Sequence, residues 1–237
     1  MTQPDISLRS PQAIATETAH FMSQVYLWMT VGVGLSGGIA YTIGNNPEMM
    51  TTLLQTPGLF PGLMITEVVA VMGLIFLAKR ISAAVATLLY LAYAVLTGCT
   101  LSVLFMAYTH ESITQVFGLT SFAFLGLSSF GYLTKRDLGP VGSFCMMGLF
   151  GLVGFSILSL FFPSMMSSTA EKTYSLCGII VFAGLTAYDT QKIKGMAGVG
   201  TAGSAEERKG AIYGALTLYL DFVNLFLSML RLTGRRK

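Results

Sequence analysis

Seven long apolar segments, separated by short polar stretches, account for most of the chain. They cover residues 25–43, 63–78, 81–108, 113–133, 141–162, 174–193 and 211–230. A helix needs about 20 apolar residues to cross the hydrocarbon core of a bilayer, and most of these segments have that length. The pattern therefore predicts an all-α polytopic membrane protein with seven transmembrane helices.

The polar stretches contain residues that end helices. Asn45-Asn-Pro47 follows the first segment, Thr134-Lys-Arg-Asp-Leu-Gly-Pro140 follows the fourth, and Pro163 follows the fifth. Proline lacks a backbone donor and cannot continue the helix before it. We therefore expect three parts: a polar N-terminal tail (1–20), a single seven-helix membrane domain (21–230) and a basic C-terminal tail (231–237).

The composition is typical of a membrane protein and leaves no room for a separate soluble domain. Of the 237 residues, 53% are hydrophobic and only 11% are charged, whereas a soluble domain has about 25% charged residues. Cys99, Cys145 and Cys177 all lie in apolar segments. We interpret them as buried packing residues and not as disulfide partners or metal ligands. The expected surroundings are the lipid bilayer, with no nucleic-acid partner.

Basic residues gather in the loops on one side of the predicted bundle. That side holds Arg9, Lys79, Arg80, Lys135, Arg136, Lys192, Lys194, Arg208 and Lys209, and the opposite loops hold only Lys172. Because loops rich in Lys and Arg stay in the cytoplasm, we predict a cytoplasmic N-terminus. Seven crossings place Arg231 and Arg235-Arg-Lys237 outside, against this rule. The alternative is that segment 211–230 enters and leaves on the cytoplasmic side; its length favours a full span.

Two aspartates lie inside the last two apolar segments. Asp189 is about one turn from the end of 174–193, and Asp221 is near the middle of 211–230. A carboxylate at membrane depth costs about 2.5–3.5 kcal/mol on insertion scales, so both are candidate functional residues. If they meet, they will share one proton and attract a cation. Helices that begin level would leave them about 9 Å apart in depth, so two separate polar residues remain the alternative.

Three further charged residues and one amide near these segments extend the set of candidates. Asn224, one turn after Asp221, continues a polar stripe along one helix face. Glu67, toward the outer end of 63–78, either contributes to a cation pathway or reaches the outer interface. Lys79 and Arg80 end the same segment. They either anchor the helix in lipid headgroups or pair with a carboxylate such as Asp189.

Two enzyme classes share parts of this pattern. Gly34-Leu-Ser-Gly37 has the form found in intramembrane serine proteases, but His20 and His110 lie outside the predicted spans, and a serine nucleophile needs a nearby base. Paired aspartates on consecutive spans resemble an intramembrane aspartyl protease of the presenilin type. However, Leu218-Tyr-Leu-Asp221 lacks that family's Gly-x-Gly-Asp, and no Pro-Ala-Leu follows. We therefore expect no enzyme activity, and the aspartyl protease is the weaker alternative.

Four stretches of the chain match one family of membrane proteins. They are Phe21-Met-Ser-Gln-Val-Tyr-Leu-Trp-Met-Thr30, Thr134-Lys-Arg-Asp-Leu138, Ala187-Tyr-Asp-Thr-Gln-Lys192 and Gly214-Ala-Leu-Thr-Leu-Tyr-Leu-Asp-Phe-Val-Asn-Leu-Phe-Leu227. With these stretches, nearly the whole chain after residue 20 resembles the transmembrane Bax inhibitor motif (Bax inhibitor-1-like) family, in its bacterial branch. The resemblance implies a seven-helix fold in the bacterial inner membrane, with the last helix central and surrounded by the other six.

The resemblance also implies a pH-sensitive calcium leak gated by a proton-sharing aspartate pair on the last two helices. Carried over to this chain, the pair is Asp189 and Asp221, which would hold Ca²⁺ transiently during permeation. The family's basic latch falls on Lys79 or Arg80. We prefer Arg80 because its planar guanidinium holds a carboxylate in two places. Ca²⁺ is then the permeant ion, and no cofactor is required. Some bacterial members are linked to the membrane protease FtsH, so the alternative is a non-transporting regulator that docks on another membrane protein.

Overall fold

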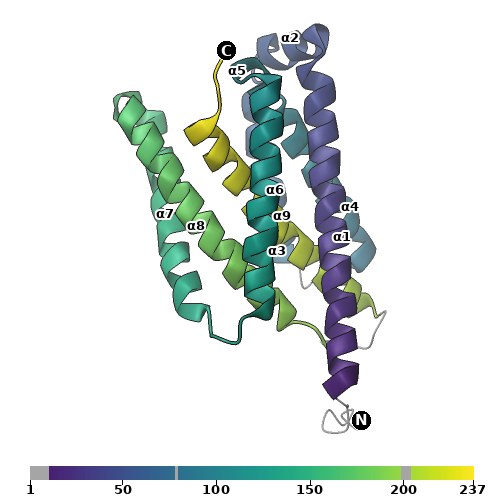
Figure 1. Ribbon diagram of the computed structural model, residues 1–237. Helices are drawn as coiled ribbons and strands as arrows, with labels where there is room; N and C mark the ends of the chain where they lie inside the picture. Colours follow the sequence, from purple (N-terminus) through teal and green to yellow (C-terminus); the bar gives the residue numbers. More distant parts are fainter. Residues whose placement is uncertain (1–10, 78–79, 199–203) are drawn as a thin grey trace.

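The computed structural model describes residues 11–77, 80–198 and 204–237, and it is all-helical over these ranges, as predicted (Figure 1). The elements are α1 (Pro11–Gly44), α2 (Pro47–Gln55), α3 (Leu59–Leu77), α4 (Ala83–Leu101), α5 (Leu104–Ala107), α6 (His110–Leu133), α7 (Gly139–Phe161), the short 3₁₀ helix η2 (Pro163–Met165), α8 (Ser168–Lys194) and α9 (Ala205–Thr233). The long helices run alternately up and down. We call the two ends of the bundle the N-terminal end and the C-terminal end, after the terminus that each carries.

Within the described residues, six segments are long and apolar enough to cross a membrane. They are α1, α3, α4 continued through α5, α6, α7 and α9. The remaining predicted span, 174–193, lies in α8, which does not qualify because Asp189 and several hydroxyl side chains interrupt its apolar sequence. The protein is therefore a polytopic all-α membrane protein, but the count of seven spans is not confirmed.

The last helix, α9, is the most buried candidate span. In α9, 61% of the most apolar 18-residue window is buried inside the molecule, whereas only 6% of that window is buried in α3 and in α7. It packs directly against α1, α4, α6 and α8, while α3 packs on α4 and α7 packs on α8. The expectation that all six other helices surround α9 is not confirmed, since these contacts show four direct neighbours with α3 and α7 outside them.

The core around α9 is aromatic. Tyr219 on α9 is fully buried, and the rings of Tyr90 and Tyr93 from α4 meet it edge to face, each with its centroid 5.9 Å away. Phe21 and Val25 of α1 belong to the same cluster. Burial of such large side chains contributes about 1.5–3 kcal/mol each relative to exposure in water, and their fixed geometry holds α9 between α1 and α4.

Hydroxyl groups mark where several helices begin. Ser82, Thr109, Ser167 and Ser204 each accept a hydrogen bond from the backbone N–H three residues later, at the start of α4, α6, α8 and α9. Such caps satisfy donors that have no partner inside the helix. These caps place the starts of α4 and α6 close to the predicted segments, whereas α8 and α9 begin about two turns earlier than predicted.

The structure adds to the sequence predictions or differs from them at three points. Residues 11–20 of the expected polar tail are helical and form the start of α1, which continues without a break into the first span; residues 1–10 of that tail lie outside the description. The third predicted segment, 81–108, is divided into α4 and α5 by a turn at residues 102–103. Cys145 is buried and Cys99 half-buried, but Cys177 is exposed on the surface of α8, so not all three cysteines are packing residues.

The C-terminal tail is bound to the C-terminal end of the bundle. α9 runs the length of the molecule, as the full-span interpretation expects, and the tail then pairs with the α5–α6 connection through the Thr109 N–H to Arg235 O bond (3.1 Å). Arg236 forms an ion pair with Glu171 and lies over the Tyr108 ring. These contacts hold the Arg236 side chain against the protein. The cytoplasmic assignment of the N-terminal end stays a prediction.

Candidate functional site

Two close approaches define how α8 and α9 lie along one another. A Cβ atom on Gly214 of α9 would be 2.9 Å from Ile193 Cγ2, and one on Gly178 of α8 would be 2.5 Å from Ser228 Oγ. Only glycine allows helices to approach this closely. The two helices are antiparallel, and each of these contacts joins two residues at the same height along the helix axes. Together the contacts define which residues of α8 and α9 lie opposite one another.

This register brings the two aspartates close in depth. Asp221 lies level with residues 185–186 of α8, and Asp189 is three to four residues further on, or about 5 Å along the helix axis. That separation is shorter than the 9 Å estimated for helices that begin level. The register of α8 on α9 therefore brings Asp189 and Asp221 to neighbouring levels of the two packed helices.

The two carboxylates have different surroundings. Asp221 is only 5% exposed, and its Oδ2 atom has no hydrogen-bond partner within the described chain. Asp189 is half-buried and interacts electrostatically with Lys192, one turn further toward the N-terminal end. A buried oxygen without a donor costs about 1–3 kcal/mol, and a proton shared with a second oxygen, or a bound cation, would lower that cost. Asp221 is therefore the unsatisfied member of the pair.

A chain of hydroxyl groups ends beside Asp189. Tyr26 Oη of α1 is 2.7 Å from Ser128 Oγ of α6, which is 2.9 Å from Thr190 Oγ1 of α8. Tyr26 and Ser128 also line a cavity of about 470 Å³ between α1 and α6 toward the N-terminal end. Sequence reasoning missed Tyr26 and Ser128, because isolated hydroxyls in apolar segments give little sign that they share one site.

The residues after Asp189 hold the neighbouring loop. Gln191 accepts a hydrogen bond from the Leu138 backbone (2.9 Å) and donates one to Arg136 O (2.8 Å). Lys194 donates to Tyr132 O at 2.7 Å and lies over the ring of that tyrosine. These contacts tie the α6–α7 connection to the end of α8, so this part of the motif supports the site by fixing the position of α8.

Glu67 lies elsewhere and is fully satisfied. Its Oε1 accepts from Thr97 Oγ1 (2.7 Å) and its Oε2 from Thr100 Oγ1 (3.0 Å), which joins α3 to α4. Asn224 donates to Leu220 O of its own helix at 2.8 Å. Neither residue forms a hydrogen bond with Asp221 in the described structure, so their roles in a cation pathway stay predictions.

The basic latch is not observed in this conformation. Arg80 is exposed, and within the described ranges no ion pair joins it to Asp189. Lys79 lies outside the described residues. A latch on either residue therefore stays a prediction for another state of the protein. Among the residues that the structure describes, no group of three or more His, Cys, Asp or Glu side chains forms a metal site.

Comparison with known proteins identifies one family. Residues 18–237 match the family model described as "Inhibitor of apoptosis-promoting Bax1". The chain is 43% identical over 218 residues to "Inner membrane protein YbhL" of Escherichia coli, with 92% of each chain covered. It is 36% identical to an uncharacterized protein of Borreliella burgdorferi, again over 92% of each chain. An uncharacterized protein of Deinococcus radiodurans is 38% identical over 91% of this chain and 90% of its own.

Proposed function

Since this chain belongs to the Bax inhibitor-1-like family of membrane proteins, we propose that it is a pH-sensitive calcium-leak channel of the bacterial inner membrane. The observation that carries the proposal is the buried Oδ2 atom of Asp221, which has no hydrogen-bond partner within the described chain and belongs to a residue about 5 Å along the helix axis from Asp189. In this proposal the N-terminal end faces the cytoplasm, and Asp189 is the member of the pair nearer to that side.

Two carboxylates suit a permeating Ca²⁺ ion better than a stored one. Calcium takes six to eight oxygen ligands in sites that bind it tightly, and Asp189 and Asp221 supply at most four carboxylate oxygens. A passing ion must bind strongly enough to enter and weakly enough to leave. The pair is therefore proposed as a transient Ca²⁺ site along the path, and no resident cofactor is required.

Protonation of the same pair would control the path. Two like charges in a site of low dielectric constant do not both ionise readily, so the pair holds one shared proton as the pH falls. With that proton bound, the attraction for Ca²⁺ is weakened, and Asp189 can pair with Arg80 to close the path. At higher pH both carboxylates are ionised, attract the cation and repel one another, which loosens α9 against α8.

The test is Ca²⁺ influx into liposomes that hold the purified protein, measured across about pH 5 to 8. We expect influx to rise with pH in the unmodified protein. Asp221→Asn and Asp189→Asn should each remove most of this pH dependence. Glu111→Gln is the matched control, because it neutralises a carboxylate in the first turn of α6, at the C-terminal end of the bundle and away from the pair.

Two results would overturn the proposal. One is a pH dependence that survives in both aspartate variants while influx persists. The other is influx no greater than in empty liposomes at any pH, which would turn attention to the regulator that docks on another membrane protein. Cleavage of a helical substrate that either aspartate variant abolishes would instead support the protease alternative.

A further inference from the structure

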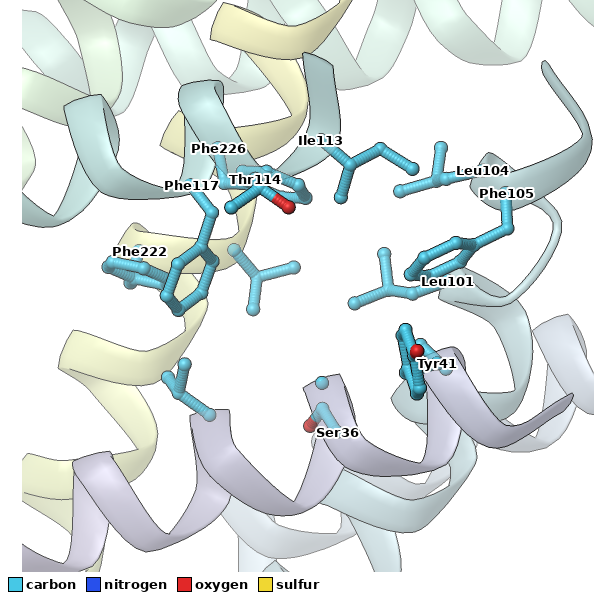
Figure 2. Close-up of a pocket in the computed structure, with 14 residues that line it drawn as sticks. Ser36, Tyr41, Leu101, Leu104, Phe105, Ile113, Thr114, Phe117, Phe222 and Phe226 are labelled. Carbon is cyan, nitrogen blue, oxygen red and sulfur yellow. The ribbon is translucent and has the colours of Figure 1, made fainter. Parts of the chain in front are cut away.

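A second, apolar cavity opens between α1 and α6 near the C-terminal end of the bundle. Both helices pack against α9, which passes behind them in Figure 1. The cavity has a volume of about 240 Å³, and residues of α1, α6 and α9 line it together with the α4–α5 connection. Figure 2 shows Phe117, Phe222 and Phe226 on one side of it and Tyr41 and Phe105 on the other.

The walls of this cavity are aromatic and fixed by one another. The Phe117 ring meets Phe222 and Phe226 edge to face, with centroids 5.6 and 6.1 Å away. Across the cavity, Tyr41 meets Phe105 edge to face at 6.0 Å. The rings therefore hold the cavity open by packing on their neighbours, and they present edges and faces to whatever occupies it.

The hydroxyl groups in the walls are mostly engaged elsewhere. Ser36 Oγ lies 2.9 Å from Ala94 O and 2.6 Å from Tyr219 Oη, and Thr114 Oγ1 donates to His110 O at 3.0 Å. A buried water needs two to four polar partners, and beyond the engaged hydroxyls of Ser36 and Thr114 the lining side chains offer only the hydroxyl of the exposed Tyr41. The chemistry of the cavity thus suits an apolar occupant and excludes sugars, nucleotides and hydrated ions.

The cavity is open to the side, at the depth of the membrane. Tyr41 is 60% exposed and Phe117 is 41% exposed on its rim, and both belong to candidate membrane spans. In a bilayer the surrounding medium at this depth is lipid acyl chain. The occupant with direct access is therefore an acyl chain from the leaflet at the C-terminal end.

Positive charge lies at the rim above the cavity. Lys237 Nζ donates to the carbonyl of Phe105, one of the lining residues, at 2.7 Å. Arg235 is exposed in the same tail, whereas Arg236 is already paired with Glu171. The acidic residue at the start of α6, Glu111, accepts a hydrogen bond from Gln115 on its own helix.

We propose that this cavity binds one acyl chain of an anionic phospholipid, whose phosphodiester lies against Lys237. Apolar walls, a lateral opening and a basic rim at one end match the three parts of such a lipid: its chain, its access from the bilayer and its charged headgroup. The bound chain fills the space beside Phe222 and Phe226 and so holds the C-terminal half of α9. This site is separate from the aspartate pair and does not rest on the proposed channel activity.

The experiment uses two adjacent glycines as a matched pair. Gly37 lines this cavity, whereas Gly38 lines a hollow beside Thr42 and Met49, and a Cβ atom would meet no neighbouring atom within 4 Å at either position. Gly37→Phe should fill the cavity, and Gly38→Phe should add the same side chain elsewhere on α1. Lys237→Gln removes the charge at the rim and keeps a long polar side chain.

The full-length protein is placed in liposomes with phosphatidylglycerol that carries a diazirine in one acyl chain. After illumination, labelled peptides are quantified by mass spectrometry. We expect labelling of α1, α6 and α9 peptides at the cavity to exceed that of the lipid-facing helices α3 and α7. Gly37→Phe should abolish this excess, and Gly38→Phe should keep it. Lys237→Gln should lower it about fivefold for phosphatidylglycerol and leave it unchanged for the matching phosphatidylcholine probe.

Three outcomes would overturn the proposal in whole or in part. Labelling spread equally over α3, α7 and the cavity would mean general lipid contact and no bound chain. Undiminished labelling in Gly37→Phe, with the variant folded as judged by its circular dichroism, would show that the label enters elsewhere. Equal labelling by the two headgroups in the unmodified protein would refute the contact with Lys237.

Discussion

The two faces of α9 treat polar groups in opposite ways. On the face toward α1 and α4, Tyr219 Oη lies 2.6 Å from Ser36 Oγ, which in turn reaches Gly32 O and Ala94 O at 2.9 Å. On the face toward α8, Asp221 is also buried but leaves Oδ2 without a partner in the described chain. The two residues are two positions apart, so they point about 200° away from one another around the helix.

This difference separates polar groups that hold the fold together from polar groups that are available for chemistry. A buried group with all its partners contributes to stability, because removing it leaves those partners unsatisfied. A buried group without partners lowers stability and persists where another role requires it. Depth in the membrane does not distinguish the two faces of α9, but hydrogen-bond satisfaction does.

The largest expected effect on stability is on the face of α9 toward α1 and α4, where the polar groups have hydrogen-bond partners. Tyr219→Ala should lower the free energy of unfolding by about 3–5 kcal/mol, because it empties a fully buried site packed against Tyr90 and Tyr93. Thermal unfolding in detergent would measure the loss. Tyr219→Phe is the milder companion, which keeps the ring and removes the bond to Ser36. A stability for Tyr219→Ala equal to that of the unmodified protein would mean that this face does not carry the fold.

A smaller loss of stability is expected when the carboxylate of Glu67 is removed. Glu67→Leu removes the acceptor of the Thr97 and Thr100 hydroxyls, and hydrogen bonds to charged groups contribute about 1.5–3 kcal/mol. The midpoint of chemical unfolding in detergent would report it. Since Glu67 joins α3 to α4, the pH dependence of Ca²⁺ influx should remain. A variant that kept its stability but lost that pH dependence would move Glu67 from the structural group to the cation pathway.

On the face of α9 toward α8, a substitution is expected to raise stability. Asp221→Leu replaces an unsatisfied buried carboxylate with an apolar side chain of similar size, so it should raise the free energy of unfolding by about 1–3 kcal/mol. The same unfolding measurement shows the gain, and under the proposed function the variant should lose the pH response. A loss of stability comparable to that of Tyr219→Ala would show that Asp221 has a partner essential to the fold.

The sequence was sufficient for the elements and insufficient for their register. Apolar length and helix-ending residues predicted α6 and α7 to within a few residues, since both properties are local. The approach of α8 to α9 could not be predicted, because it depends on which glycine meets which side chain, as Gly214 does with Ile193. The turn that separates α4 from α5 also lacks a proline or glycine signal.

The residues of the candidate site were predictable from the sequence, but their hydrogen bonding was not. Asp189 and Asp221 were candidates because a carboxylate in an apolar segment is costly to insert into a membrane, and the family resemblance paired them. The missing partner of Asp221 Oδ2 and the hydroxyl chain through Ser128 depend on side chains from four helices, α1, α6, α8 and α9. The apolar cavity beside Phe222 is equally non-local, because α1, α6 and α9 each contribute part of its wall.

The smallest expected effect lies at the C-terminal end, where a satisfied charge meets solvent. Arg236→Gln breaks the ion pair with Glu171, and since both side chains are partly exposed we expect a loss of only about 0.2–1 kcal/mol. The loss should shrink as salt is added, because mobile ions screen exposed charges. Unfolding midpoints at low and high salt would measure it. The backbone hydrogen bonds between the tail and the α5–α6 connection remain in this variant. The tail should therefore stay attached mainly through its main chain. A loss of stability as large as that of Glu67→Leu would instead show that the Arg236 side chain holds the tail in place.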